Sequence, residues 1–207
     1  GGNATRLYWH VGLLPVQFPV FAIASGAGLM LLIVGWFMPN LEEKQRGDLL
    51  WLLAIITIAT SVAKLYFLVA DYTQSLYGGA TDNLIAVNYV LNGPHAFMFW
   101  GVQIALGLFI PVIVLAQPKL AKNGFIAGLM GLFLLIGYAA ARILIVVPGQ
   151  VAEMMPGQAE AFYGPKLSLA YTPSLMEWSV TSAIIGFSIL ALLIGLDRFV
   201  RFTEVKK

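Results

Sequence analysis

Three charged residues stand inside long apolar segments of this sequence, namely Lys64, Arg142 and Glu177. Ionisable side chains are costly in hydrocarbon, so in membrane proteins they normally face a bundle interior or a wet cavity. An amine or a carboxylate can take up and release protons, and a guanidinium can hold an anion. We therefore expect a membrane protein whose polar interior serves an ion, proton or ligand pathway.

Three further titratable residues lie where apolar segments begin or end. Asp71 ends the second segment, His95 begins the third and His10 precedes the first. Lys64 and Arg142 each lie about 10 Å inside the outer end of their segments, from the helical rise per residue. The inner half of every segment is almost purely apolar. This asymmetry predicts one polar cavity that opens outward and argues against a continuous channel.

Each of these residues also has a purely structural interpretation. Lys64 could extend its long stem toward the interface and keep its charge in water. Arg142 could pair with Glu177 or Asp71 only to lock helices together. The carboxylates and the histidines could be ordinary solvated groups at the membrane edge. The cluster as a whole is more persuasive than any of its members.

The composition determines which elements must position these side chains. Hydrophobic residues make up 59% of the 207 residues and charged residues 11%, whereas soluble domains carry roughly 25% charged residues. Five apolar runs approach or exceed the roughly 20 residues that a helix needs to cross the hydrocarbon core. We predict an all-α, polytopic transmembrane bundle over residues 1–207, with spans at 13–37, 49–70, 95–116, 125–147 and 173–196.

The charges of the loops alternate along the chain. Eight basic residues follow spans one, three and five: Lys44, Arg46, Lys119, Lys122, Arg198, Arg201, Lys206 and Lys207. The opposite side carries only Arg6 and Lys166. The positive-inside rule then places the N-terminus outside and the C-terminus in the cytoplasm. Residues 71–94 and 148–172 are predicted to be the long outside loops.

Several kinds of chemistry are disfavoured by what the sequence lacks. The chain has no cysteine, which excludes disulfides and iron–sulfur clusters ligated by this chain. His10 and His95 sit at span ends, whereas haem ligands in helix bundles lie well inside, so we expect neither haem nor another metal site. A net charge of +2 does not suggest nucleic acid, and no phosphate-binding loop is present.

Three segments resemble the NrfD/PsrC family, the membrane subunits of polysulfide reductase-type complexes and of some membrane-bound hydrogenases (HybB-like). Residues 171–178 read Tyr-Thr-Pro-Ser-Leu-Met-Glu-Trp, and residues 142–150 read Arg-Ile-Leu-Ile-Val-Val-Pro-Gly-Gln. Residues 9–15, Trp-His-Val-Gly-Leu-Leu-Pro, are similar to the family's mid-chain motif and are less specific alone. The resemblance covers essentially the whole chain.

The resemblance implies a membrane subunit that exchanges electrons between quinone or quinol (menaquinone or ubiquinone) and a ferredoxin-like iron–sulfur subunit outside. It also implies further redox subunits, a prokaryotic cytoplasmic (inner) membrane and no haem. Family members usually have eight to ten spans, so we expect N-terminal helices, with much of the best-described quinone pocket, beyond this chain.

In this interpretation the titratable residues divide into two groups. Asp71, Glu177 and Lys64 transfer protons, which could be coupled to proton translocation across the membrane. His10, His95 and Arg142 belong to a quinone pocket, where Arg142 holds nearby charge or stabilises a quinone anion. We expect no catalytic residue in the chain by itself.

Two other classes of function remain open from the residues alone. An ion or solute transporter module could use the same buried charges to bind its solute. A structural membrane anchor for a peripheral enzyme would need the charges only for assembly. An inverted repeat in the complete gene would favour transport, whereas a neighbouring iron–sulfur subunit would favour redox chemistry.

Overall fold

The computed structural model describes residues 14–38, 41–78, 81–151, 157 and 173–204, and its regular elements there are all helices. Five of them are long and apolar enough to cross a membrane: Pro15–Phe37, Glu43–Tyr77, Met98–Leu115, Gly124–Gln150 and Leu175–Gly195. The predicted all-α membrane fold with five spans is therefore confirmed. The elements are α1 (Leu14–Leu32), η2 (Ile33–Phe37), α2 (Glu43–Tyr77), α3 (Thr81–Leu91), η3 (Met98–Phe109), α4 (Ile110–Leu115), α5 (Pro118–Ala121), α6 (Gly124–Val151) and α8 (Leu175–Glu204).

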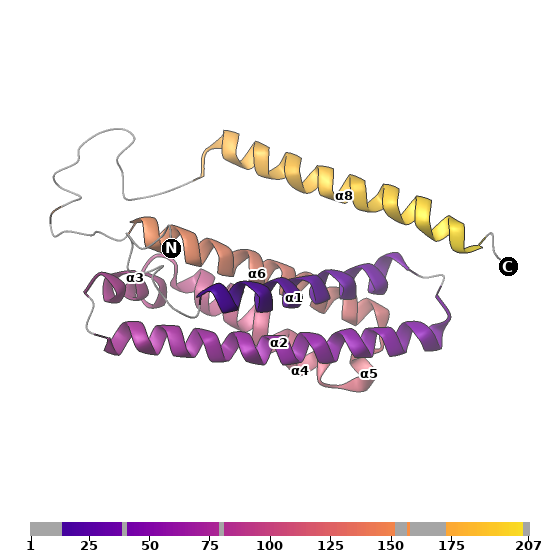
Figure 1. Cartoon of the computed structure of the whole chain (residues 1–207), viewed down its shortest axis with the longest axis horizontal. Coiled ribbons are helices and arrows are strands. Elements are labelled where there is room, and N and C mark those ends of the chain that lie inside the picture. The colour runs from indigo at the N-terminus through magenta and orange to yellow at the C-terminus, as the bar shows by residue number, and fades with distance from the viewer. Residues whose placement is uncertain (1–13, 39–40, 79–80, 152–156, 158–172, 205–207) are drawn as a thin grey trace. The chain divides into compact units, whose positions relative to one another are not determined.

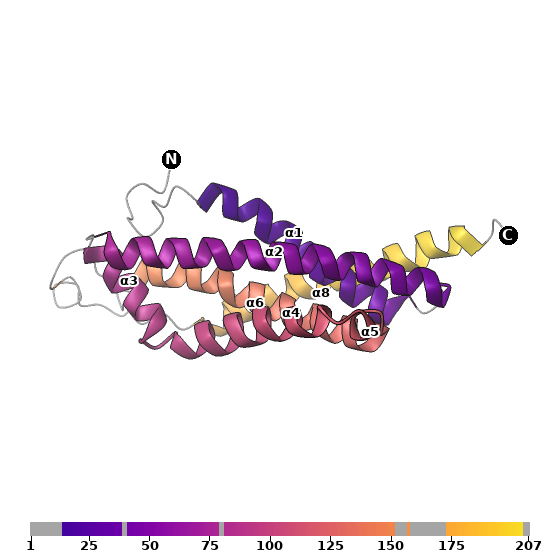
Figure 2. The ribbon, with the colours of Figure 1, turned by 90° about the horizontal axis from the view of Figure 1, so that it is seen from below.

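The chain divides into two compact units, the first ending at Leu169 and the second, which holds α8, beginning at Ala170. In the first unit α1, α2 and α6 run lengthwise beside one another, with α3 at one end and α5 at the other (Figure 1; Figure 2). Helix α6 packs against both α1 and η3, and α1 packs against α2. These helices carry the titratable residues of the first unit.

Two apolar clusters form the core of the first unit. The larger cluster includes Leu50 and Ala54 of α2 with Tyr138 of α6. The smaller cluster joins α3, η3 and α6, and Leu68 and Tyr72 of α2 pack against it. Along α2, the residues between Ala54 and Leu68 therefore lie between the two clusters.

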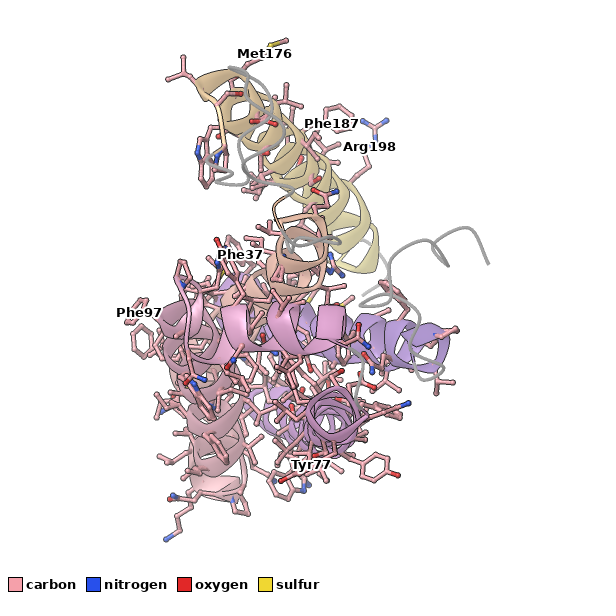
Figure 3. All side chains as sticks on the ribbon, turned by 90° about the vertical axis from the view of Figure 1, so that its left-hand side faces the viewer. Phe37, Tyr77, Phe97, Met176, Phe187 and Arg198 are labelled. Atoms are coloured by element: carbon pink, nitrogen blue, oxygen red, sulfur yellow. The ribbon has the colours of Figure 1, made fainter. Side chains whose placement is uncertain are left out.

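Many of the outward-facing side chains are also apolar, as expected of helices that face lipid. Tyr77 and Phe97 are 86% and 81% exposed and point away from the bundle (Figure 3). Phe187 of α8, in the second unit, is 73% exposed. In a bilayer such side chains meet acyl chains, so their exposure carries no penalty.

The prediction that residues 71–94 form a loop is wrong. Helix α2 continues to Tyr77, and α3 occupies Thr81–Leu91. Ala86, Val87 and Val90 are all buried, and their spacing puts them on one face of a helix. Pro148 does not end its span either, because it lies inside α6. Polar and glycine residues around these segments suggested loops, but one apolar face is enough to hold a short helix against the bundle.

The spans end where their free backbone carbonyls find side-chain donors. The guanidinium of Arg46 donates from Nε to the carbonyl oxygen of Val34 at 3.2 Å, and from a terminal nitrogen to that of Gly35. The indole Nε1 of Trp36 donates to the carbonyl oxygen of Phe125 at 3.2 Å. The last carbonyls of a helix lack intrahelical partners, so Arg46 and Trp36 satisfy groups that hydrocarbon cannot.

Replacing Arg46 by methionine should therefore destabilise the chain. We expect a loss of about 1.5–3 kcal/mol, the usual contribution of a hydrogen bond to a charged group. Thermal unfolding of the purified protein in detergent measures the change. The matched control is Lys44→Met, because Lys44 is exposed at the start of the same helix. Equal stabilities of the two variants would contradict this role for Arg46.

An ion pair brings two of the basic connections to one end of the first unit. The Lys122 Nζ atom lies 2.9 Å from a carboxylate oxygen of Asp48. Both side chains are exposed, so the pair contributes little to stability. Its value is as a marker, because the basic residues after spans one and three lie together as the loop pattern predicted. The orientation of this end relative to a cytoplasm stays a prediction.

Candidate functional site

Lys64 lies at the centre of the candidate site and is completely buried, at 0% exposure. Its ammonium nitrogen is 3.9 Å from the centre of the Tyr138 ring and 5.6 Å from that of Phe21. Within the described part of the chain, this nitrogen has no hydrogen-bond partner. The alternative that Lys64 extends its charge to water is therefore wrong.

The energies at Lys64 do not balance in favour of the fold. Contact of an ammonium with aromatic faces contributes about 2 kcal/mol when desolvated. The effective penalty of burying an ion is several kcal/mol, which is larger. Among the described residues the ion pair present is Lys122–Asp48, so no carboxylate of these residues offsets the penalty. Lys64 is a residue that stability alone would replace.

Asp71 lies two turns further along α2 and is half-buried. Its Oδ2 accepts a hydrogen bond from the amide nitrogen of Gln17 on α1. Its Oδ1 is buried without a partner among the described residues. The structure thus joins Asp71 to Gln17, and not to Lys64 or Arg142. The alternative in which Arg142 locks Asp71 to another helix is not what the described residues show.

Arg142 lies on α6, one turn after Tyr138, and its side chain is exposed within the first unit. Both residues line a groove of about 300 Å³ between α1 and α6. Small residues make much of its wall. The other lining residues are Ala22, Ser25, Gly26, Leu29, Leu135 and Ala139. Tyr138 thus borders this groove and also contacts Lys64.

His95 lies at the other end of the site, in the turn between α3 and η3. Its ring centre is 5.2 Å from that of Tyr89, and its Nδ1 is buried without a partner among the described residues. His95 does not line the groove that holds Arg142. His10, the other predicted pocket histidine, lies outside the described residues.

Glu177 has a clear local role at the start of α8, in the second unit. Its Oε2 accepts hydrogen bonds from the backbone nitrogen of Ser174 at 2.6 Å and from the Ser174 hydroxyl at 2.8 Å. The backbone nitrogen of Glu177 in turn donates to the Ser174 hydroxyl at 3.3 Å. This reciprocal arrangement is a capping box. Glu177 therefore satisfies the helix start, whatever else it does.

The comparison with protein families assigns the chain. The family model described as "Polysulphide reductase, NrfD" matches residues 3–153, which include every titratable residue of the first-unit site. The chain belongs to the NrfD family. The predicted resemblance is confirmed, and with the five apolar helices it makes this a multi-pass membrane protein.

Curated NrfD-like relatives align along almost the whole chain. It is 30% identical over 202 residues to a selenate reductase subunit of Mesobacillus selenatarsenatis, covering 97% of this chain and 46% of that protein. It is 27% identical over 202 residues to the Hdr-like menaquinol oxidoreductase integral membrane subunit of Archaeoglobus fulgidus, covering 95% and 51%. The chain spans about half the length of these relatives. No solved structure matches it.

In this NrfD-family chain the structure adds three residues that the sequence interpretation did not select. Thr57, Ser61 and Tyr138 are buried around Lys64. Their hydroxyl oxygens lack hydrogen-bond partners among the described residues. A signal was present, because Thr57, Ser61 and Lys64 are spaced four and then three residues apart, which places them on one helix face. Neutral hydroxyls in an apolar run did not attract notice beside the charges.

Proposed function

We propose that this chain is part of the membrane subunit of a respiratory redox complex. It exchanges electrons between menaquinol or another membrane quinone and an iron–sulfur partner subunit on the extracytoplasmic side, with further redox subunits in the complex. The observation that carries the proposal is the family match over residues 3–153. A relative named as a menaquinol oxidoreductase subunit, aligned over 95% of this chain, supports it.

The groove beside Arg142 is where residues of this chain fit a quinone head group. About 300 Å³ is at the small end of ligand pockets, which are mostly apolar with a few polar groups. Ala22, Gly26 and Ala139 leave space for a flat ring, and the guanidinium of Arg142 can donate to a carbonyl oxygen. A bound quinone would supply the electron chemistry, and the chain would orient it. His10 and His95 stay predicted pocket residues.

Lys64, Asp71 and Glu177 are proposed to move the protons that accompany quinone chemistry. The support is strongest for Lys64, because a buried amine without a counter-charge is costly to the fold and such groups mark functional sites in membranes. Tyr138 lies between this amine and the groove. The proposal places the protein in a prokaryotic cytoplasmic membrane, with the N-terminus outside and the C-terminus in the cytoplasm.

The test is purification of the intact complex through a tag on this protein. We expect an iron–sulfur subunit to co-purify and the complex to oxidise a menaquinol analogue. Arg142→Ala should lower kcat/KM for the quinol by about 10-fold or more, mainly through KM, because it removes a charged hydrogen-bond donor. Arg198→Ala, which changes an exposed arginine of α8, should not.

Other outcomes of this experiment would identify the rival functions. A complex with solute flux but no quinol oxidation would show a transporter module and overturn the proposal. Reduced assembly in Arg142→Ala, with unchanged turnover for each assembled complex, would show that Arg142 serves only as part of an anchor.

A further inference from the structure

A polar stripe runs along the buried face of α2 beside Lys64. Thr57, Ser61 and Lys64 occupy positions i, i+4 and i+7, which lie on one face of a helix. Their exposed fractions are 0%, 1% and 0%. Tyr138 of α6 covers this stripe, with its ring against the Lys64 nitrogen and its hydroxyl close enough to Ser61 to interact. Four polar groups therefore share one buried layer.

None of these four groups has a hydrogen-bond partner among the described residues. This is true of the Thr57 Oγ1, the Ser61 Oγ, the Lys64 Nζ and the Tyr138 hydroxyl. Buried polar groups in native proteins are almost always paired with protein or with ordered water. Thr60, on a neighbouring face of the same helix, shows the ordinary solution, since its hydroxyl donates to the carbonyl of Ile56 at 2.8 Å.

The layer lies between the two apolar clusters, so neither cluster supplies the missing partners. Ala54 belongs to the larger cluster on one side of the layer, and Leu68 packs against the smaller cluster on the other. A buried water typically makes two to four hydrogen bonds to polar groups that are otherwise unsatisfied. Four converging groups meet that requirement, whereas the flanking clusters do not.

We infer that ordered water molecules fill the layer between Thr57, Ser61, Lys64 and Tyr138, and that this water delivers protons to and from Lys64. Hydroxyls and water each donate and accept hydrogen bonds, so a proton can pass along them while the same number of bonds is kept. The amine binds the proton, and the hydroxyls of Thr57 and Ser61 position the water. The proton-delivery part rests on the proposed function; the presence of water does not.

The first experiment tests the water by itself. The chain has no cysteine, so Ser61→Cys introduces one thiol in place of a hydroxyl of similar size. Ala54→Cys is the matched control, because both positions are at most 1% exposed and lie two turns apart on α2. In the purified complex transferred to heavy water, infrared spectroscopy follows exchange of the thiol hydrogen. We expect exchange at position 61 to be at least about 10-fold faster, because contact with water speeds proton transfer.

Equal exchange at positions 54 and 61 would overturn the inference, because burial alone predicts equal rates. This result does not depend on quinol oxidation, so it holds whether or not the proposed function fails.

The second experiment tests proton delivery in the same complex. Thr57→Val removes an unpaired hydroxyl and keeps the shape of the side chain, and Thr60→Val is its control. We expect Thr57→Val to slow proton release during quinol oxidation by about 10-fold with a larger solvent isotope effect, while Thr60→Val leaves both unchanged. Fast thiol exchange with no difference between the two valine variants would show that water is present but does not carry the protons.

Discussion

Replacing Lys64 by methionine should lower quinol turnover about 100-fold while making the protein more stable. The loss follows because positioned proton-transfer groups contribute roughly 100-fold or more to rates, and Lys64 is the buried amine nearest the proposed quinone groove. The gain in stability should be about 1–3 kcal/mol, the usual penalty of a buried polar group without a partner. Methionine fills the same unbranched volume without an amine.

The opposite signs of these two effects give the experiment its power. Turnover is measured with a menaquinol analogue, and stability by thermal unfolding in detergent. Lys119→Met is the control, because Lys119 is exposed and its loss should change neither quantity. A variant that loses both stability and activity would show that Lys64 is needed only for the fold, through its contact with Tyr138.

Replacing Gly137 by alanine should prevent normal packing of α6. Gly107 of η3 and Gly137 face each other so closely that a Cβ on either residue would overlap the backbone of the other. We expect a loss of about 1–3 kcal/mol, as for other overpacked sites, although alanine favours a helix over glycine by about 1 kcal/mol. Thermal unfolding of the purified protein measures it.

Gly26→Ala is the control for this prediction, since nothing lies within 4 Å of a Cβ built at Gly26. It should be neutral or slightly stabilising. The double variant Gly107→Ala with Gly137→Ala should cost less than the sum of the two single changes, because the first methyl already separates the helices. Simple additivity would argue against a shared contact.

The fold was largely predictable because membrane helices announce themselves by length and hydrophobicity. The predicted second span, residues 49–70, lies inside Glu43–Tyr77, and the predicted fourth, 125–147, inside Gly124–Gln150. Helix α3 was missed, because its stability depends on burying Val87 and Val90 against neighbours and no local pattern reports those neighbours. The π-helical turns of η3 (Met98–Phe109) were missed for the same reason.

The candidate site was predictable in its charged members but not in their partners. The cost of a charge in hydrocarbon singled out Lys64 and placed it inside the bundle, as the structure shows. Which residue faces it depends on how α2 and α6 are rotated about their axes, so contact with Tyr138 could not be foreseen. The same holds for the hydrogen bond between Gln17 and Asp71, which joins residues 54 positions apart.

The paired bonds between Ser174 and Glu177 determine which substitution at Glu177 is informative. Glutamine is accepted at this position of a capping motif as readily as glutamate, so Glu177→Gln removes the negative charge and leaves the first turn of α8 intact. Alanine would remove both at once. A defect shared by the two replacements therefore reports on acid–base chemistry, and a defect confined to alanine reports on how the last span begins.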